Sequence, residues 1–192
     1  MLHKKIFRVL VFILCVGFVQ KGFAQEVAVI NNKGTIQNII KPTVAEIYCA
    51  SPATSQVINE GAFSDINFGT AGIVDTDDYT IGASANQITI ETVGRYEIIY
   101  RVTAENNVNS RTGCEFYLEV RGSEANGTRA YTYTRNNLVN RNTVTVSKIV
   151  DLSTVPAIVK VKGQVYNSSQ TATSATATIT NNGASLIIKR IK

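Results

Sequence analysis

Histidine, methionine and tryptophan are almost missing from this chain of 192 residues, which contains one histidine, one methionine and no tryptophan. The two that occur, His3 and Met1, both lie in an N-terminal segment with the features of a signal peptide. The rest of the chain therefore has no histidine for a Ser-His-Asp or Cys-His arrangement, and a zinc site would depend on two cysteines and carboxylates. We expect neither a histidine-dependent nucleophilic enzyme nor a zinc enzyme.

Helical periodicity and phosphate-binding loops are also absent. No stretch of a dozen residues repeats the i, i+3, i+4, i+7 spacing of an amphipathic helix. No glycine-rich loop of the Walker or dinucleotide type occurs. Valine, isoleucine, threonine, tyrosine and asparagine are abundant instead, and only 17% of the residues are charged. The predicted class is all-β, and we expect a non-enzymatic protein without a cofactor.

The segment 1–24 has the features of a secretory signal peptide. Lys4 and Lys5 precede the apolar run Ile6 to Val19, and Gly22-Phe23-Ala24 places small residues where a signal peptidase cuts. The run is shorter than the ~20 residues that a membrane-spanning helix needs, and no later segment comes close. We therefore expect a mature chain without a transmembrane segment that is secreted, periplasmic or held at the cell surface.

The basic charge of the chain lies mostly in this signal peptide. Its removal takes away four of the 19 basic residues and none of the 14 acidic ones, so the net charge falls from +5 to +1. Binding to nucleic acid or to an anionic membrane needs a concentrated basic face, so we expect neither partner. We divide the chain into the signal peptide, a short segment 25–42 and one domain, 43–192, which is long enough for its own core.

The longest alternation of apolar and polar residues runs from Ile88 to Val102 and indicates a strand, a tight turn at Val93-Gly94 and a second strand. A period of two is expected where one face of a sheet is buried. The apolar positions on one face of the second strand are Tyr96, Ile98, Tyr100 and Val102. We expect this strand to lie at the centre of a β-sandwich.

The motif Gly94-x-Tyr96-x-Ile98-x-Tyr100-x-Val102 resembles the central signature of C1q-like and tumour-necrosis-factor-like jelly rolls. Upstream, Gly61 to Phe68 and Asp75 to Tyr79 resemble the family's strand ending in phenylalanine and its acidic loop, and Ala184 to Lys189 resembles its closing strand. The similarity spans Val44 to Lys192. It implies a single antiparallel jelly-roll β-sandwich, and it implies a homotrimer, because such heads pack as three sandwiches around an axis.

Weaker patterns predict the other elements. Residues 25–41 favour either a first strand pair or a loose tether, and Gly69 to Asn86 is expected to be the longest loop. Thr143 to Leu152 and Ala157 to Tyr166 have the pattern of a hairpin. Asn181-Asn182-Gly183 predicts a tight turn into the final strand, because Asn-Gly readily adopts a positive φ.

Two groups of polar residues are candidates for ligand binding. The first is an acidic cluster whose closely spaced oxygens suit calcium, although the glycine and distant glutamate of an EF-hand loop are missing and a solvated loop is the alternative. The second is a set of aromatic and guanidinium side chains that could line a recognition surface, with core or subunit packing as the alternative. The candidates are Asp75, Asp77, Asp78, Arg129, Tyr131 and Tyr133.

Cysteines and outward-facing isoleucines yield two further predictions. Cys49 and Cys114 remain after signal cleavage, and in an oxidising compartment they could form a disulfide worth roughly 4 kcal/mol, or stay as two buried thiols. Ile99, Ile187 and Ile191 stand opposite the buried positions and are the candidate contacts of a trimer, since small residues at 171–180 would let another sheet approach.

The function predicted from the sequence is a secreted recognition or adhesion head that binds a protein or a glycan through loops at one end of the sandwich. One alternative is a carbohydrate-active hydrolase on the same fold, which would require two carboxylates in a cleft. The other alternative is a structural subunit of a surface appendage, which would assemble beyond a small closed oligomer.

Overall fold

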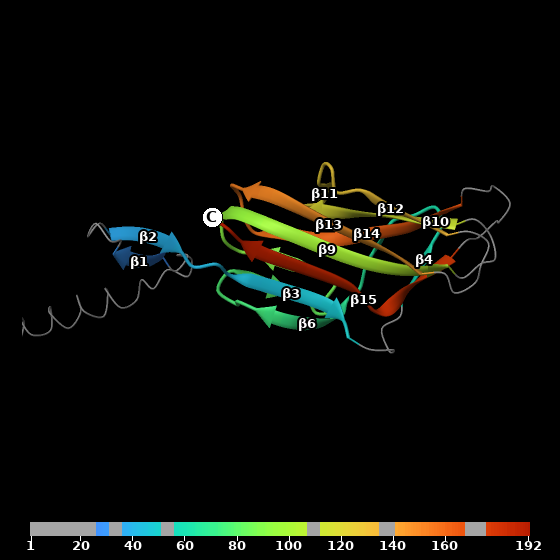
Figure 1. Cartoon of the computed structure of the whole chain (residues 1–192), viewed down its shortest axis with the longest axis horizontal. Coiled ribbons are helices and arrows are strands. Elements are labelled where there is room, and N and C mark those ends of the chain that lie inside the picture. Colours follow the sequence, from blue (N-terminus) through green and yellow to red (C-terminus); the bar gives the residue numbers. More distant parts are fainter. Residues whose placement is uncertain (1–25, 31–35, 51–55, 107–111, 135–140, 168–175) are drawn as a thin grey trace, which may run out of the picture.

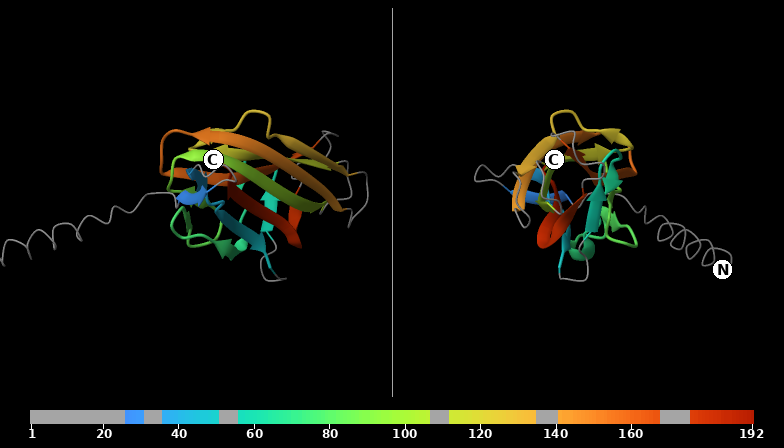
Figure 2. Two further views of the ribbon diagram at one scale, coloured as in Figure 1. Left: turned by 60° about the vertical axis from the view of Figure 1, so that its left-hand side comes forward. Right: turned by 90° about the vertical axis from the view of Figure 1, so that its right-hand side faces the viewer.

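Alternating apolar residues form two facing antiparallel sheets in the computed structural model of the protein (Figure 1). The structure describes residues 26–30, 36–50, 56–106, 112–134, 141–167 and 176–192. The predicted signal peptide lies outside the described residues. Figure 2 shows the two sheets as curled layers that enclose the core. The all-β antiparallel sandwich predicted from the sequence is confirmed.

One sheet has six strands, which lie side by side across the front of Figure 1. Its order is β13 (Arg141–Leu152), β9 (Gly94–Asn106), β15 (Thr176–Arg190), β3 (Val44–Cys49) and β6 (Gly69–Val74), with β4 (Gln56–Asn59) also paired to β15. The strand β9 is central, as the alternation predicted, because it pairs with β13 on one side and with β15 on the other.

The other sheet has seven strands and covers the opposite side of the core. Its order is β11 (Ser123–Glu124), β10 (Thr112–Val120), β14 (Ala157–Asn167), β8 (Ile88–Ile90) and β7 (Tyr79–Ile81), while β12 (Ala130–Thr134) pairs with β10 and β5 (Ser64–Asp65) pairs with β14. β1 (Glu26–Ile30) and β2 (Ile36–Ile40) form a separate two-stranded sheet. Of the two alternatives for this segment, the strand pair is therefore correct.

The chain repeatedly crosses from one sheet to the other, as in a jelly roll. The strands β8 and β9 follow one another in sequence but belong to different sheets, and so do β13 and β14. The predicted hairpin of Thr143–Leu152 with Ala157–Tyr166 is therefore wrong: β13 pairs with β9, and β14 pairs with β10 and β8. Short connections in a sandwich can pass around the edge between layers as well as fold a strand back on itself.

Two other local predictions also need correction. Residues 69–86, expected to be a long loop, contain β6 and β7. The predicted tight turn at Asn181-Asn182-Gly183 lies inside β15, which pairs with β9 on both sides of a register shift between Ile179 and Ala184. Asn182 does adopt the positive φ that its residue type favours, with a value of 56°. Its conformation belongs to a bulge, because the strand continues in the same direction.

The core is formed by the predicted inward positions of β9 together with buried residues of β10. Tyr96, Ile98, Tyr100 and Val102 are at most 1% exposed, and Phe116 on β10 is fully buried. Neighbouring aromatic and aliphatic side chains from the other strands fill the space between the sheets. The largest of these are Tyr79, Phe68, Ile47, Ile58, Ile66, Ile88, Ile90 and Leu118.

The buried hydroxyl of Tyr100 ties the two sheets together. It donates its one proton to the carbonyl oxygen of Thr128 at 2.6 Å, and it also lies 3.2 Å from the carbonyl oxygen of Phe116. Thr128, two residues before β12, is itself fully buried, and its hydroxyl donates to Ala125 O at 2.7 Å. A polar group in the core needs such partners, so Tyr100 fixes how the segment leading into β12 sits on β9.

Replacement of Tyr100 by phenylalanine removes the hydroxyl and its hydrogen bond to the carbonyl oxygen of Thr128. We expect Tyr100→Phe to lower the free energy of unfolding by about 1–3 kcal/mol, measured by urea denaturation monitored by circular dichroism. Tyr131→Phe is the control: its ring is 57% exposed, and the change should stay within about 0.5 kcal/mol. Equal effects of both substitutions would show that the buried hydroxyl has no special role.

Candidate functional site

The acidic cluster lies in the turn between β6 and β7, where its carboxylates accept hydrogen bonds from neighbouring segments. Asp75 accepts a hydrogen bond from the backbone N–H of Val44 at 2.7 Å. Asp78 is 4% exposed and accepts hydrogen bonds from the hydroxyls of Thr43, at 2.6 Å, and Thr92, at 2.5 Å. Asp77 is exposed. The three carboxylates thus have separate roles and do not converge on one ion.

No group of three or more histidine, cysteine, aspartate or glutamate residues that could hold a metal ion is found within the described part of the chain. The carboxylates of Asp75 and Asp78 are already used as acceptors for backbone and hydroxyl donors. Calcium would have to displace these donors to gain the six to eight oxygen ligands that it prefers. The turn therefore has the features of a structural element.

Arg190 brings a buried positive charge to Asp78. Its side chain is 6% exposed, and Nη1 lies 3.6 Å from Asp78 Oδ1. Nη2 donates to the carbonyl oxygen of Val93 at 2.8 Å, whereas Nε and Nη1 make no hydrogen bond to any described residue. The hydroxyl of nearby Tyr96 donates to Thr92 O at 2.5 Å. These groups form a cluster of buried polar side chains at one end of the core.

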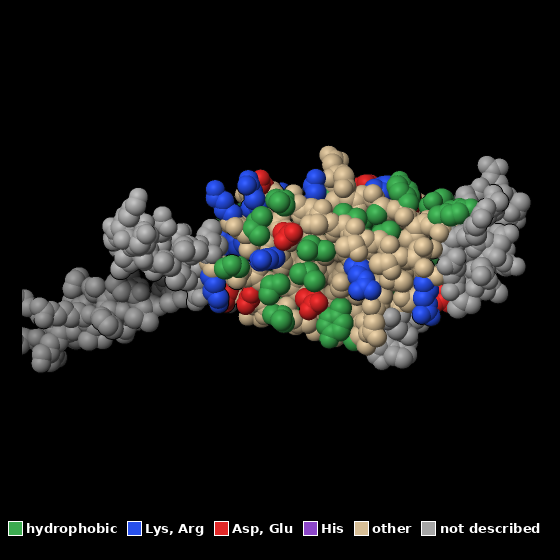
Figure 3. All heavy atoms as spheres, in the orientation of Figure 1, with side chains coloured by type: hydrophobic (Ala, Val, Ile, Leu, Met, Phe, Trp, Pro, Cys, Tyr) green, Lys and Arg blue, Asp and Glu red, His purple; other side chains and the backbone are tan. Residues whose placement is uncertain are grey.

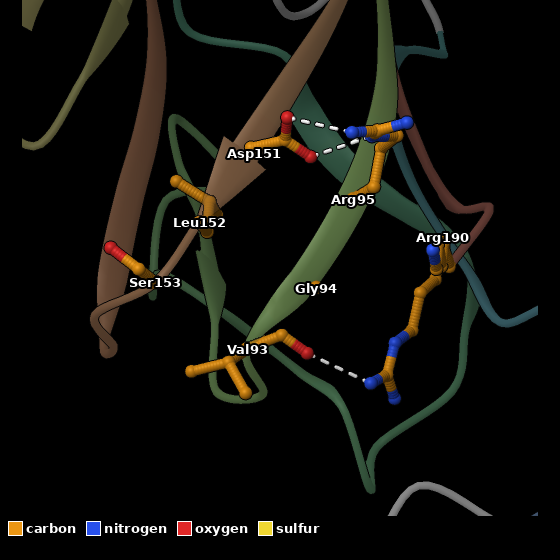
Figure 4. Close-up of a pocket in the computed structure, with 8 residues that line it drawn as sticks. Val93, Gly94, Arg95, Asp151, Leu152, Ser153 and Arg190 are labelled. Atoms are coloured by element: carbon orange, nitrogen blue, oxygen red, sulfur yellow. Dashed lines mark hydrogen bonds and ion pairs between the residues drawn. The ribbon is translucent and has the colours of Figure 1, made fainter.

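An open pocket of about 550 Å3 borders this polar cluster (Figure 4). Arg95 Nε and Nη2 donate to the two oxygens of Asp151, at 2.6 and 3.0 Å, across the neighbouring strands β9 and β13. These hydrogen bonds hold the pKa of Asp151 below its ordinary value. The lining is Val93, Gly94, Arg95, Asp151, Leu152, Ser153, Arg190 and Lys192.

The chemistry of this pocket does not match glycoside hydrolysis, which uses two carboxylates on either side of the bond. Its one lining carboxylate is Asp151, and that group is held in a bidentate ion pair. A second pocket, of about 330 Å3, is lined by residues that include Glu119 as its one carboxylate, beside Arg121 and Lys160. Neither of these two pockets therefore supports the hydrolase alternative.

The second group of candidates lies at β12, on the outer side of the seven-stranded sheet. Tyr131 and Tyr133 are 57% and 47% exposed, so the core-packing interpretation is wrong for both. Arg129 lies 5.2 Å from the ring centroid of Phe63 and 5.1 Å from that of Tyr117, within cation–π distance. These side chains form a surface of aromatic rings and polar groups.

Ion pairs hold Arg129 in place on this surface. Its Nη1 lies 3.1 Å from Glu115 Oε2, and its Nε donates to Glu124 Oε1 at 3.0 Å. Gln164 Nε2 also donates to Glu115. Sequence reasoning named Arg129 but missed Glu115 and Gln164, whose outward direction is visible in the period of two along β10 and β14.

The structure does not bring the two candidate groups into one site. The acidic turn is bound to Thr43, Val44 and Thr92, whereas Arg129 and the tyrosines face outward from β12 and contact side chains of β10 and β14. The carboxylates thus contribute to stability, and the exposed aromatic surface is the better candidate for ligand binding.

The predicted disulfide does not form in this structure. Cys49 and Cys114 are both free and buried. They lie on β3 and β10, in different sheets, and each packs within its own surroundings: Cys49 Sγ lies 3.5 Å from Asn67 O, and the hydroxyl of Thr132 bonds to the backbone of Cys114. An even number of cysteines gives no information about the distance between them.

Loss of the buried Asp78 carboxylate would leave the Arg190 guanidinium in the core without its counter-charge. We expect Asp78→Ala to lower the free energy of unfolding by about 3–5 kcal/mol, because breaking a buried ion pair strands the remaining charge. Asp77→Ala, one residue away and exposed, is the matched control and should change it by less than about 0.5 kcal/mol. A large loss for Asp77→Ala, or none for Asp78→Ala, would contradict this assignment.

Burial also governs the two thiols. It raises the pKa of Cys49 and raises that of Cys114 from 9.0 to about 11. Since the thiol ionises more easily in the unfolded chain, the contribution of Cys114 to stability is complete below pH 9 and is lost between pH 9 and about 11.

We expect iodoacetamide to label both cysteines of residues 25–192 only after denaturation, as measured by mass spectrometry without reductant. A chain two hydrogens lighter that resists labelling would indicate a disulfide.

No protein-family model and no curated protein sequence matches the chain. Solved structures with a similar fold do exist. Murine APRIL at pH 5.0 superposes with a TM-score of 0.53 at 12% identity, covering 79% of this chain and 100% of that one. Eiger TNF from S. frugiperda superposes with a TM-score of 0.51 at 8% identity, covering 79% of this chain and 93% of that one.

These similarities extend over most of this chain and over nearly the whole of the solved domains. At such low identity they bear on the fold alone. Within the described residues no helix is long and apolar enough to cross a membrane. The strand order, the crossings between sheets and the superpositions together show that the domain has a tumour-necrosis-factor-like jelly-roll fold.

Proposed function

We propose that the protein is a secreted, non-enzymatic recognition head that acts as a homotrimer. The observation that carries this proposal is a group of isoleucines on the outer face of the six-stranded sheet. Figure 3 shows this face, with hydrophobic side chains spread over it among acidic and basic ones. An exposed apolar surface of this kind is typical of a protein–protein contact.

The predicted contact residues lie together on this face. Ile99 on β9 and Ile187 on β15 are direct cross-strand partners and are half-buried. Ile191, just beyond β15, is 43% exposed. The structure adds Ile149 on β13, which is 57% exposed and lies opposite Glu97, next to Ile99. Burying such side chains contributes about 25 cal/mol per Å2 of apolar surface.

Charges of both signs surround these isoleucines. Ile187 is the cross-strand partner of Glu46, and Lys189 is the partner of Glu97. A surface with interspersed acidic and basic groups can complement another copy of itself without net repulsion. Closed cyclic symmetry would cover the face of every copy at once, which supports a trimer over an open array.

An aspartate at the centre of this face would place an unpaired charge in each copy of the interface. We expect light scattering of residues 25–192 at micromolar concentration to give the mass of three chains, and Ile99→Asp to raise the dissociation constant of the trimer by at least about tenfold. Far-UV circular dichroism should show that the variant remains folded.

The matched control is Ile158→Asp, the same substitution at an isoleucine that is 41% exposed on β14 in the other sheet. It should leave the trimer intact. The mass of a single chain for the unmodified protein would refute the proposal, and assemblies much larger than a trimer would support the appendage subunit instead.

A further inference from the structure

Three tyrosines gather on the outer side of the seven-stranded sheet, on the face opposite to the apolar isoleucines. We call Tyr131 and Tyr133 of β12 and Tyr166 of β14 the tyrosine face. Their sequence neighbours Thr132 and Val165 are buried, so the alternation directs the three rings away from the core. The proposed trimer contact does not use these residues.

Strand register brings the three rings together. Gly113 of β10 pairs with Tyr133 on one side and with Tyr166 on the other. A Cβ at Gly113 would lie 2.4 Å from Tyr166 Cζ, so the ring rests on the glycine backbone. Tyr131 and Tyr166 have ring centroids 6.1 Å apart with planes at 83°. A glycine at this point therefore lets the Tyr166 ring lie close to the backbone, beside two more exposed tyrosines.

Polar side chains lie beside the tyrosine rings on the same outer face of the sheet. Glu115 of β10 pairs with Tyr131 and with Gln164 in the sheet register. Its carboxylate accepts from Gln164 and is paired with Arg129, which also binds Glu124. Since two carboxylates pair with the single guanidinium, this group carries no net positive charge that would attract an anionic ligand.

We propose that the tyrosine face binds a neutral glycan chain. The C–H groups of a pyranose ring carry a slight positive charge and pack on the negative face of an aromatic ring, while its hydroxyls both donate and accept hydrogen bonds. Tyr131 and Tyr133 stand two residues apart, about 7 Å along the strand, a distance that a sugar ring with its linkage can span. Gln164 and Arg129 offer polar groups at the side, while Glu115, which is 9% exposed, holds both of them in place.

Charge and shape favour this occupant over the others. An anionic polymer would meet a guanidinium that is already paired with two carboxylates, so it would gain little attraction. The rings lie on the outer surface of a sheet, which suits an extended chain of sugars. Tyrosine presents a large amphipathic surface at small cost in side-chain entropy, and this makes it effective at polar contacts.

This inference rests on the proposed function as a recognition head, and it names the ligand class and places the site on a sheet face, where the sequence had favoured loops. The probes are the neutral polysaccharides laminarin, xyloglucan, galactomannan and dextran, each included in a native gel. Alginate and dextran sulfate serve as charged counterparts. We expect at least one neutral polysaccharide to slow the migration of residues 25–192 and the charged ones not to do so.

The double variant Tyr131→Ala, Tyr133→Ala should weaken this binding by about tenfold or more, because two stacking surfaces are lost. The double variant Tyr131→Phe, Tyr133→Phe keeps both rings and should retain most of the affinity. The control Ile73→Ala changes a side chain that is 67% exposed on β6, in the other sheet, and should have no effect.

Three results would overturn the inference: no retardation by any neutral polysaccharide, retardation by the charged polymers alone, or binding that survives both alanine substitutions. Light scattering of the alanine variant gives a further check. A fall in its oligomeric mass would show that the rings contact a second copy of the chain and would also reject the glycan site. A monomeric protein that still binds glycan through the tyrosines would refute the trimer and leave this inference standing.

Discussion

The structure depends on the requirement that polar tips of buried aromatic side chains find partners inside the core. Tyr100 carries its hydroxyl from the central strand of one sheet to carbonyl oxygens of the other. One of these belongs to Thr128, so the start of β12 is fixed against the core. Arg129 and Tyr131, which follow at once, are thereby directed outward. A single buried contact thus links core packing to the surface that we associate with binding.

Sequence periodicity predicted which side of a strand is buried but could not assign the strand to a sheet. The alternation in β9 correctly identified Tyr96, Ile98 and Tyr100 as inward positions. The same pattern in β13 and β14 suggested a hairpin, yet they belong to different sheets. In a jelly roll both layers bury one face, so a period of two is common to neighbours in either arrangement. Only long-range pairing distinguishes the two.

The candidate sites show a similar limit at the level of side chains. Three nearby aspartates are equivalent in the sequence, yet burial beside Arg190 sets Asp78 apart from exposed Asp77. Tyr131 and Tyr133 could be named from their spacing, whereas Tyr166 joins them only through its register with β10. The Tyr166 ring lies on the backbone of Gly113 because the two residues are cross-strand partners, although they are far apart in the chain. Such groupings follow from topology, which local patterns do not contain.

The two outer faces of the sandwich are separated by a shared core about 10 Å thick. Most side chains of the two faces lie far apart, although β13 and β12 meet at one edge, where Asn142 Nδ2 donates to the carbonyl oxygen of Tyr133 at 3.0 Å; substitutions at distant sites usually act additively. Changes around the tyrosines can therefore accumulate during evolution without altering the isoleucines of the six-stranded sheet. With the proposed trimer contact and the proposed glycan site on opposite layers, a change in the ligand would not require a change in the assembly.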